Sequence, residues 1–186
     1  MLQFRLKPHP EENSQSVACQ ILRHHDTLRI EFTATFQEPL RDLANCEAPG
    51  SFTDNLWQST CCELFIAQPR STNYVEWNFA TDGRYALYYF DEIRKRADED
   101  TQTRARTSLA PLAMQVEQLE HSFKMAIDLP LKSIHDFVGH PAWQFQPTAI
   151  LATADGQLSY WAPAHPRPEP DFHRFDHVQN HDPYGW

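Results

Sequence analysis

The sequence is poor in basic residues and contains no long apolar run. Lysine and arginine total 16 against 25 acidic residues, which leaves a formal net charge of −9. Nucleic acids and anionic membranes select for basic surfaces, so we expect neither as a partner. No window is apolar enough to cross a bilayer, and the first segment, MLQFRLKPHPEENSQ (1–15), lacks the apolar centre of a secretion signal. We therefore expect a cytoplasmic protein.

Cysteine is also scarce, and its spacing excludes the common zinc patterns. The four cysteines, Cys19, Cys46, Cys61 and Cys62, include no CxxC pair. Neighbouring side chains of a strand point to opposite faces, so Cys61 and Cys62 are not expected to bond to each other. We predict free thiols that serve as small apolar packing residues.

Aromatic residues and alternating apolar patterns are plentiful and favour strands. Residues 28–36 (LRIEFTATF) alternate Leu28, Ile30 and Phe32 with polar side chains, which is typical of a half-buried strand. About nine such strands are predicted, at 18–25, 28–36, 58–67, 74–80, 84–90, 112–119, 122–129, 143–153 and 157–162.

Helical signals are few. Residues 129–137 favour a short helix, and 91–107 fit either a frayed helix or a solvated loop. Strand follows strand without helical crossovers, which predicts an all-β fold: a two-sheet antiparallel β-sandwich with at most one or two short helices, as a single domain over 1–186. The proline-rich stretch APAHPRPEPDFH (162–173) is expected to cross the sandwich as an extended strap.

Asp82-Gly83 lies between two strand patterns and favours a two-residue type I′ hairpin. That turn would pair Thr81 with Arg84, Phe79 with Ala86, Trp77 with Tyr88 and Val75 with Phe90, giving an apolar core face. The opposite face would then carry Glu76 opposite Tyr89, Asn78 opposite Leu87 and Ala80 opposite Tyr85.

The stretch LWQSTCCELFIA (56–67) places a glutamate inside an apolar run. Alternation assigns Thr60, Cys62, Leu64 and Ile66 to the core face, and Trp57, Ser59, Cys61, Glu63 and Phe65 to the other. A short loop joins this strand to the next, so the three strands are expected to form a meander whose polar sides merge into one surface.

The merged surface combines carboxylates, an amide, an indole and phenols, which suits a sugar. Pyranose C–H faces stack on aromatic rings, and sugar hydroxyls need groups that accept or both donate and accept hydrogen bonds. The alternative is structural: Glu63 and Glu76 would be solvated or paired with Arg84 or Arg94.

Three motifs in order, LWQSTCCELFIA, YVEWNFATDGRYALYYFDEIR and LSYWAPAHPRPEPDFHRFDHV, resemble the DOMON-like family of bacterial proteins. That family is related to the family-nine carbohydrate-binding modules and to sugar- or haem-binding DOMON domains. The resemblance implies an immunoglobulin-like or jelly-roll-like sandwich.

The residues that carry the resemblance fall into three groups. The spacing of Trp57 and Glu63 is similar to that of the sugar-binding modules, and Glu76, Asn78 and Gly83 match the hairpin pattern. The closing motif is matched by Trp161, His165, Asp171, Phe172 and His173. Related modules clamp a sugar between two tryptophans, and here the second would be Trp161 or a later residue.

Parts of the sequence are also compatible with four other functions. Haem binding would need an axial ligand such as Met114 or Met125. The alternating pattern of the strand assigns Met125 to the core face. A metal site would rest on His173, His177 and His181, spaced four apart.

An enzyme would use Glu63 and Glu76 across a glycosidic bond, or a Cys61–His165 dyad. An exposed sheet face is expected to keep both carboxylates ionised. A protein-interaction module would instead present a flat apolar patch.

These patterns together predict a non-catalytic module that binds a carbohydrate or a sugar-containing metabolite without a cofactor or metal. Trp57 would stack on the sugar, and Glu63, Glu76 and Asn78 would bind its hydroxyls. Arg84 and Tyr89 would line the rim. Trp161 and His165 complete the predicted site, while Asp171 and His173 are expected to pin the strap.

Overall fold

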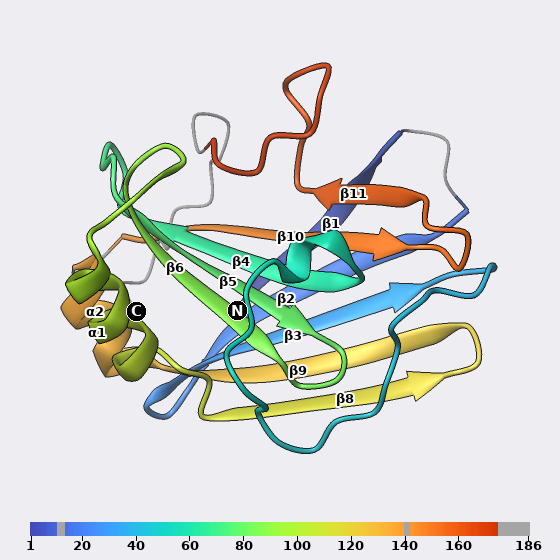
Figure 1. Ribbon diagram of the computed structural model, residues 1–186, viewed down its shortest axis with the longest axis horizontal. Helices are drawn as coiled ribbons and strands as arrows, with labels where there is room; N and C mark the ends of the chain where they lie inside the picture. The colour runs from blue at the N-terminus through green and yellow to red at the C-terminus, as the bar shows by residue number, and fades with distance from the viewer. Residues whose placement is uncertain (11–13, 140–141, 175–186) are drawn as a thin grey trace.

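The computed structural model describes residues 1–10, 14–139 and 142–174, and it consists mainly of antiparallel strands (Figure 1). The strands of the first half are β1 (Leu2–His9), β2 (Ser16–His24), β3 (Thr27–Thr35), β4 (Cys61–Ala67), β5 (Tyr74–Ala80) and β6 (Tyr85–Glu92). Those of the second half are β7 (Lys95–Arg96), β8 (Ala113–Leu119), β9 (Ser122–Pro130), β10 (Gln144–Ala152) and β11 (Leu158–Ala162). Two helices, α1 (Glu99–Ser108) and α2 (Leu131–Val138), and the 3-10 turn Leu56–Gln58 complete the described elements.

All eleven strands belong to one hydrogen-bonded sheet, in the order β7-β6-β5-β4-β10-β11-β1-β2-β3-β9-β8. Strand β1 joins its two halves, because residues 2–6 pair with β2 whereas residues 7–9 pair with β11. The predicted antiparallel all-β class and the two short helices are confirmed. The hydrogen bonding forms one open sheet where the sequence predicts two sheets, since the unpredicted first strand belongs to both halves.

The main core draws on both halves of the sheet. Ile30 and Phe32 of β3 belong to the same buried cluster as Leu64 of β4 and Trp77 of β5. Alternation along each strand sends the intervening side chains to the opposite face. On β4 the cluster takes Cys62, Leu64 and Ile66, which confirms the predicted core face of that strand.

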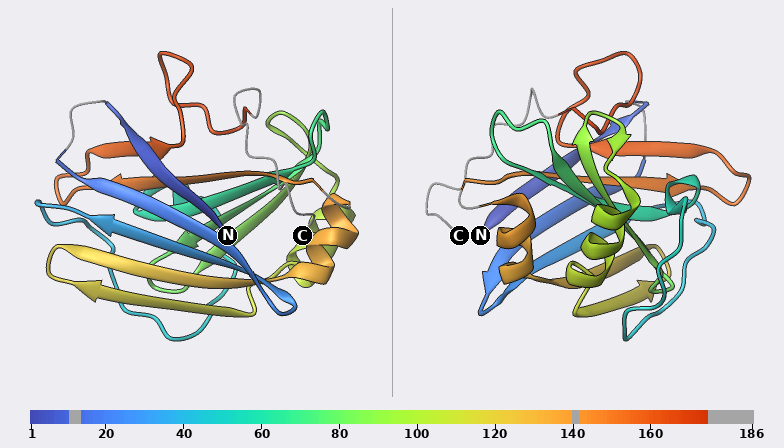
Figure 2. Two further views of the ribbon diagram at one scale, coloured as in Figure 1. Left: turned by 180° about the vertical axis from the view of Figure 1, so that it is seen from behind. Right: turned by 60° about the vertical axis from the view of Figure 1, so that its left-hand side comes forward.

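The two helices lie at the same end of the sheet (Figures 1 and 2). Arg104 of α1 stacks over the ring of Phe137 in α2, 5.2 Å from its centroid. Asp98 caps α1 by accepting a hydrogen bond from the Thr101 N–H at 2.8 Å, which is why a helix forms within 91–107. None of the helices in the described residues is long and apolar enough to span a membrane.

The β5–β6 hairpin has a register different from the predicted one. Glu76 pairs with Tyr88, and Val75 pairs with Tyr89. The Ala80 N–H donates to the Arg84 carbonyl at 2.9 Å, so the loop has three residues instead of two. Gly83 closes it with φ +91°, the positive value that a three-residue hairpin requires at this position.

Tertiary contacts select this longer loop. The Thr81 hydroxyl donates to the Asp42 carbonyl at 2.6 Å and accepts from the Ala44 N–H at 3.1 Å. These bonds hold Thr81 in the loop and away from strand pairing. A one-residue change in register exchanges the two faces of β6, so the predicted facing pairs across this hairpin are wrong.

Candidate functional site

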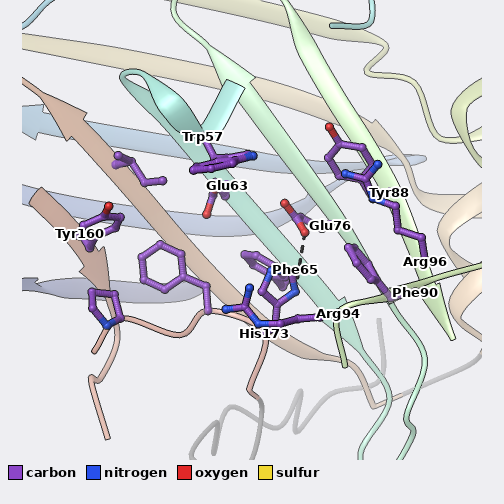
Figure 3. A pocket seen from close by; sticks show the side chains of 13 residues that line it. Trp57, Glu63, Phe65, Glu76, Tyr88, Phe90, Arg94, Arg96, Tyr160 and His173 are labelled. Atoms are coloured by element: carbon purple, nitrogen blue, oxygen red, sulfur yellow. Dashed lines mark ion pairs between the residues drawn. The ribbon is translucent and has the colours of Figure 1, made fainter. Parts of the chain in front are cut away.

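A pocket of about 340 Å³ opens on the face of β4, β5 and β6 that is turned away from the main core (Figure 3). Its walls come from these strands, from β10 and β11, from the β6–β7 hairpin and from the segment after β11. The lining residues are Trp57, Glu63, Phe65, Glu76, Tyr88, Phe90, Arg94, Arg96, Ile150, Tyr160, Pro170, Phe172 and His173.

Two rows of cross-strand neighbours form the floor beneath the pocket, and the members of these rows that line the pocket itself are Glu63, Phe65, Glu76 and Tyr88. The first row runs Thr148, Glu63, Asn78 and Ala86 across β10, β4, β5 and β6. The second row, one step along the strands, runs Gln146, Phe65, Glu76 and Tyr88. Glu63 and Glu76 are therefore diagonal neighbours on one face, which places two carboxylates within reach of a common ligand.

Glu63 is only 2% exposed and is held by neutral donors. Its Oε2 accepts a hydrogen bond from the Thr148 hydroxyl at 2.8 Å, and its Oε1 is 3.8 Å from the Cys61 thiol. Burial raises the pKa of Glu63 well above its ordinary value, and the neighbouring charge of Glu76 raises it further. The carboxyl therefore retains its proton at a higher pH than an exposed glutamate.

Glu76 is 5% exposed, and its hydrogen-bond partner is Asn78. The Asn78 amide donates to Glu76 Oε1 at 2.6 Å, while Oε2 lies 4.0 Å from His173 Nδ1. Burial raises the pKa of Glu76, and the Asn78 hydrogen bond and the charges of Arg96 and Arg94 oppose that effect. The prediction that an exposed sheet face keeps both glutamates ionised is wrong, because the face is covered.

The cover is the proline-rich segment 163–173, which we call the strap. Gln146 donates to the Phe172 carbonyl at 2.6 Å, and Arg94 pairs with Asp171 at 3.0 Å. His173 shares a hydrogen bond of 2.7 Å with the Tyr74 hydroxyl. The predicted pinning roles of Asp171 and His173 are confirmed, and the strap also walls the pocket.

His173 is a neutral wall residue near neutral pH. Burial, together with the nearby charge of Arg94, lowers its pKa from the ordinary 6.5 to about 4. Its ring lies among those of Phe65, Tyr74 and Phe90, with centroid separations between 5.3 and 5.9 Å. It therefore gives Glu76 no cationic partner at that pH.

Two arginines from the β6–β7 hairpin reach the rim of the pocket. Arg94 is engaged with Asp171, as described above. The Arg96 guanidinium lies 3.8 Å from the ring centroid of Tyr88, and the Tyr88 hydroxyl donates to Asp54 at 2.8 Å. Neither arginine makes an ion pair with Glu63 or Glu76, so the predicted alternative of a Glu–Arg94 pair is wrong.

Trp57 stands at the pocket as an exposed aromatic ring. It lies in the 3-10 turn before β4 and not on the strand itself, yet its indole is beside Glu63 (Figure 3). Of the four tryptophans in the described part of the chain, it alone is exposed, at 46%. The sequence pattern placed it on the correct side of the sheet although the local structure is different.

Four of the predicted site residues lie elsewhere. Tyr89 points to the core side of β6, where its hydroxyl accepts from the Asn73 amide at 2.7 Å. Arg84 pairs with Asp82 at 2.6 Å in the hairpin loop. Trp161 is 1% exposed in the main core and donates to the Ser159 hydroxyl at 3.0 Å. His165 bonds the Lys7 carbonyl at 2.9 Å, outside the pocket lining.

The pocket is lined instead by residues that the sequence pattern did not predict. Tyr88 replaces Tyr89 because of the shifted register, and Tyr160 lines the pocket because its neighbour Trp161 faces the core. The correct hairpin register is the signal that would have found Tyr88. Asn78 shares the face with both glutamates as predicted and supports Glu76 from the floor.

Three residues named for the alternative functions, Met114, Met125 and Cys61, are buried outside the pocket lining. Met114 and Met125 are buried in the main core. Burial raises the pKa of the Cys61 thiol well above its usual range, which opposes formation of a thiolate. His177 and His181 lie outside the described residues. Within the described residues, no group of three or more His, Cys, Asp or Glu side chains is placed to hold a metal ion.

Comparison with solved structures finds proteins that have a similar fold. No protein-family model matches the chain, and no curated protein matches it. A candidate carbohydrate-binding protein from Bacteroides uniformis has a similar structure, with a TM-score of 0.56 and 13% identity over 92% of this chain and 82% of that one. The fold resembles that of carbohydrate-binding proteins.

Two further structures are of a family-9 carbohydrate-binding module from Caldicellulosiruptor kristjanssonii. The complex with cellotriose gives a TM-score of 0.54 at 8% identity, covering 86% of this chain and 71% of that one. The complex with glucose gives 0.53 at 7%, covering 81% and 68%. At these identities the likeness concerns the fold, and the ligand has to be argued from the pocket.

Phe172→Ala is expected to loosen the strap. The Phe172 ring is buried and packs 6.2 Å from Tyr160, and its removal leaves the strap attached by its polar contacts and by the ring of His173. We expect faster cleavage of the strap in limited proteolysis, while the urea midpoint falls by less than that of a main-core variant. Leu119→Ala, an exposed site on β8, is the control. Equal cleavage rates in Phe172→Ala and wild type would contradict this anchoring.

Proposed function

We propose that this protein is a non-catalytic module that binds a carbohydrate or a sugar-containing metabolite in the pocket on β4, β5 and β6. The observation that carries the proposal is the exposed indole of Trp57 beside two buried carboxylates (Figure 3). A sugar needs an apolar surface for its C–H face and acceptors for its hydroxyls. The similarity in fold to carbohydrate-binding modules supports the same conclusion.

Each group has a distinct role in this proposal. Trp57 stacks on the ring, while Glu63 Oε1 and Glu76 Oε2 face the hydroxyls, because their other oxygens are occupied by Thr148 and Asn78. A buried carboxylic acid both donates and accepts, which suits a hydroxyl group. The size of the pocket, about 340 Å³, lies at the small end of the range for ligand sites and suits a single sugar unit.

Trp57→Ala is expected to weaken sugar binding at least tenfold, since truncation of an aromatic anchor typically costs on the order of 2 kcal/mol. The test is tryptophan fluorescence titrated with monosaccharides, oligosaccharides and nucleotide sugars. Wild type should show saturable quenching or a blue shift with one class. Leu119→Ala is the matched control, because it also removes an exposed apolar side chain. No response from wild type across the panel would refute the proposal.

A further inference from the structure

The floor of the pocket contains more hydrogen-bond acceptors than donors. Its carboxylate and amide oxygens are the two of Glu63, the two of Glu76, Asn78 Oδ1 and Gln146 Oε1. Two of these six accept a hydrogen bond of 2.8 Å or less, namely Glu63 Oε2 from Thr148 and Glu76 Oε1 from Asn78. Asn78 Oδ1 and Gln146 Oε1 lie next to the acid pair but outside the pocket lining, and they are buried without a hydrogen bond to any described residue. Buried acceptors without donors are costly, so the arrangement favours a ligand that brings donors.

Within 1–10, 14–139 and 142–174, no arginine or lysine makes an ion pair with either acid of the floor. Glu63 and Glu76 are both at least 95% shielded from solvent, and burying two acids without a cation is unfavourable unless protons remain on them. The other charged and titratable groups around the pair are Arg94, Arg96, His173, Cys61, Tyr74 and Tyr88. The rim arginines are directed to Asp171 and to the Tyr88 ring, so none of the residues that the structure describes places a cation between the two acids.

We infer that the sugar bound here carries a free ammonium group, seated between Glu63 and Glu76. This inference rests on the proposed function and names the class of sugar. An ammonium group supplies three N–H donors and one positive charge. The donors can bond to the acceptor oxygens, and the charge can pair with the two acids. The aromatic rings of Phe65 and Trp57 line the same pocket, and aromatic faces attract cations.

Binding of an ammonium group should change the number of protons held by Glu63 and Glu76, whereas binding of a neutral sugar should not. Near neutral pH the acid pair holds a proton, because burial and mutual repulsion favour the neutral form. An ammonium group between the two acids favours their ionised form, so binding should release up to about one proton to the buffer. The rim arginines repel the ammonium, but from a solvated position where the effect is screened.

The experiment is calorimetric titration of the full chain with glucosamine, glucose and N-acetylglucosamine, in two buffers of different ionisation enthalpy. We expect glucosamine to bind at least tenfold more tightly than the other two and to release protons. Glu63→Gln and Glu76→Gln should each remove that advantage, because a neutral amide offers no negative charge to the ammonium group. Glu92→Gln removes one exposed charge outside the pocket lining and is the control for net charge.

The outcomes separate this inference from the proposed function. If glucose binds as tightly as glucosamine, or if the advantage survives in both glutamine variants, the ammonium site is refuted and the sugar site stands. If no sugar binds in either buffer, both are refuted. Proton release with glucosamine alone, lost in Glu63→Gln, supports both.

Discussion

Trp77→Ala is expected to lower the free energy of unfolding by about 3–5 kcal/mol, the usual range for removing a large buried aromatic side chain. Trp77 is fully buried in the main core, where Leu64 and Leu87 flank it on neighbouring strands. Its indole N–H donates to the Leu109 carbonyl at 3.0 Å. The substitution therefore leaves both a cavity and a buried carbonyl without its donor.

Urea unfolding followed by circular dichroism measures this loss. Trp77→Phe is the matched control, because it keeps most of the apolar volume and loses only the hydrogen bond and part of the ring. Its effect should be smaller by at least about 1 kcal/mol. A loss below about 1 kcal/mol for Trp77→Ala would be inconsistent with its place at the centre of the core.

The second large effect concerns pH. Glu63 and Glu76 have raised pKa values in the folded state, so their contribution to stability is full below the ordinary glutamate pKa and is lost as pH rises through the folded values. His173 has a lowered pKa, so its contribution is full above 6.5 and is lost as pH falls toward 4. The two effects oppose each other in mild acid. Above pH 6.5 the glutamates act first, and the buried thiols of Cys19, Cys61 and Cys62, whose pKa values are also raised, add to the loss only as pH approaches 9.

We therefore expect the free energy of unfolding to fall by about 1–3 kcal/mol between about pH 6.5 and about pH 9, since one pKa unit corresponds to about 1.4 kcal/mol. The double variant Glu63→Gln with Glu76→Gln should show a flatter curve and exceed wild type in stability at the alkaline end. Urea midpoints measured across this range test the expectation. Glu92→Gln with Glu99→Gln removes two exposed acids as a control. Parallel curves for wild type and the pocket variant would contradict the buried acid pair.

Local patterns in the sequence determined most of the strands and their faces. Alternation alone assigned Leu64 and Trp77 to the core, and it brought Glu63 and Glu76 to one surface. It succeeded because side chains of a strand alternate with a period of two, whatever the rest of the chain does. The strap was also predictable, because its prolines exclude the regular hydrogen bonding of helices and central strands.

Tertiary contacts decided the rest. Asp82-Gly83 is compatible with loops of two or three residues, and the bonds of Thr81 to the distant 42–44 segment selected three. That choice exchanged Tyr89 for Tyr88 in the pocket. Trp161 and Tyr160 alternate on β11, and only the pairing of Trp161 with Ala149 turned the tryptophan to the core.

The protonation of the two glutamates was likewise a tertiary property. Their residue types and spacing indicated a polar surface, but the strap and the β6–β7 hairpin, contributed by distant segments, excluded water from it. A pKa responds to the surroundings of the charge and not to its place in the sequence. Which side chains share a face therefore follows from alternation along each strand, whereas their burial and the ligands they can bind depend on how distant segments fold over them.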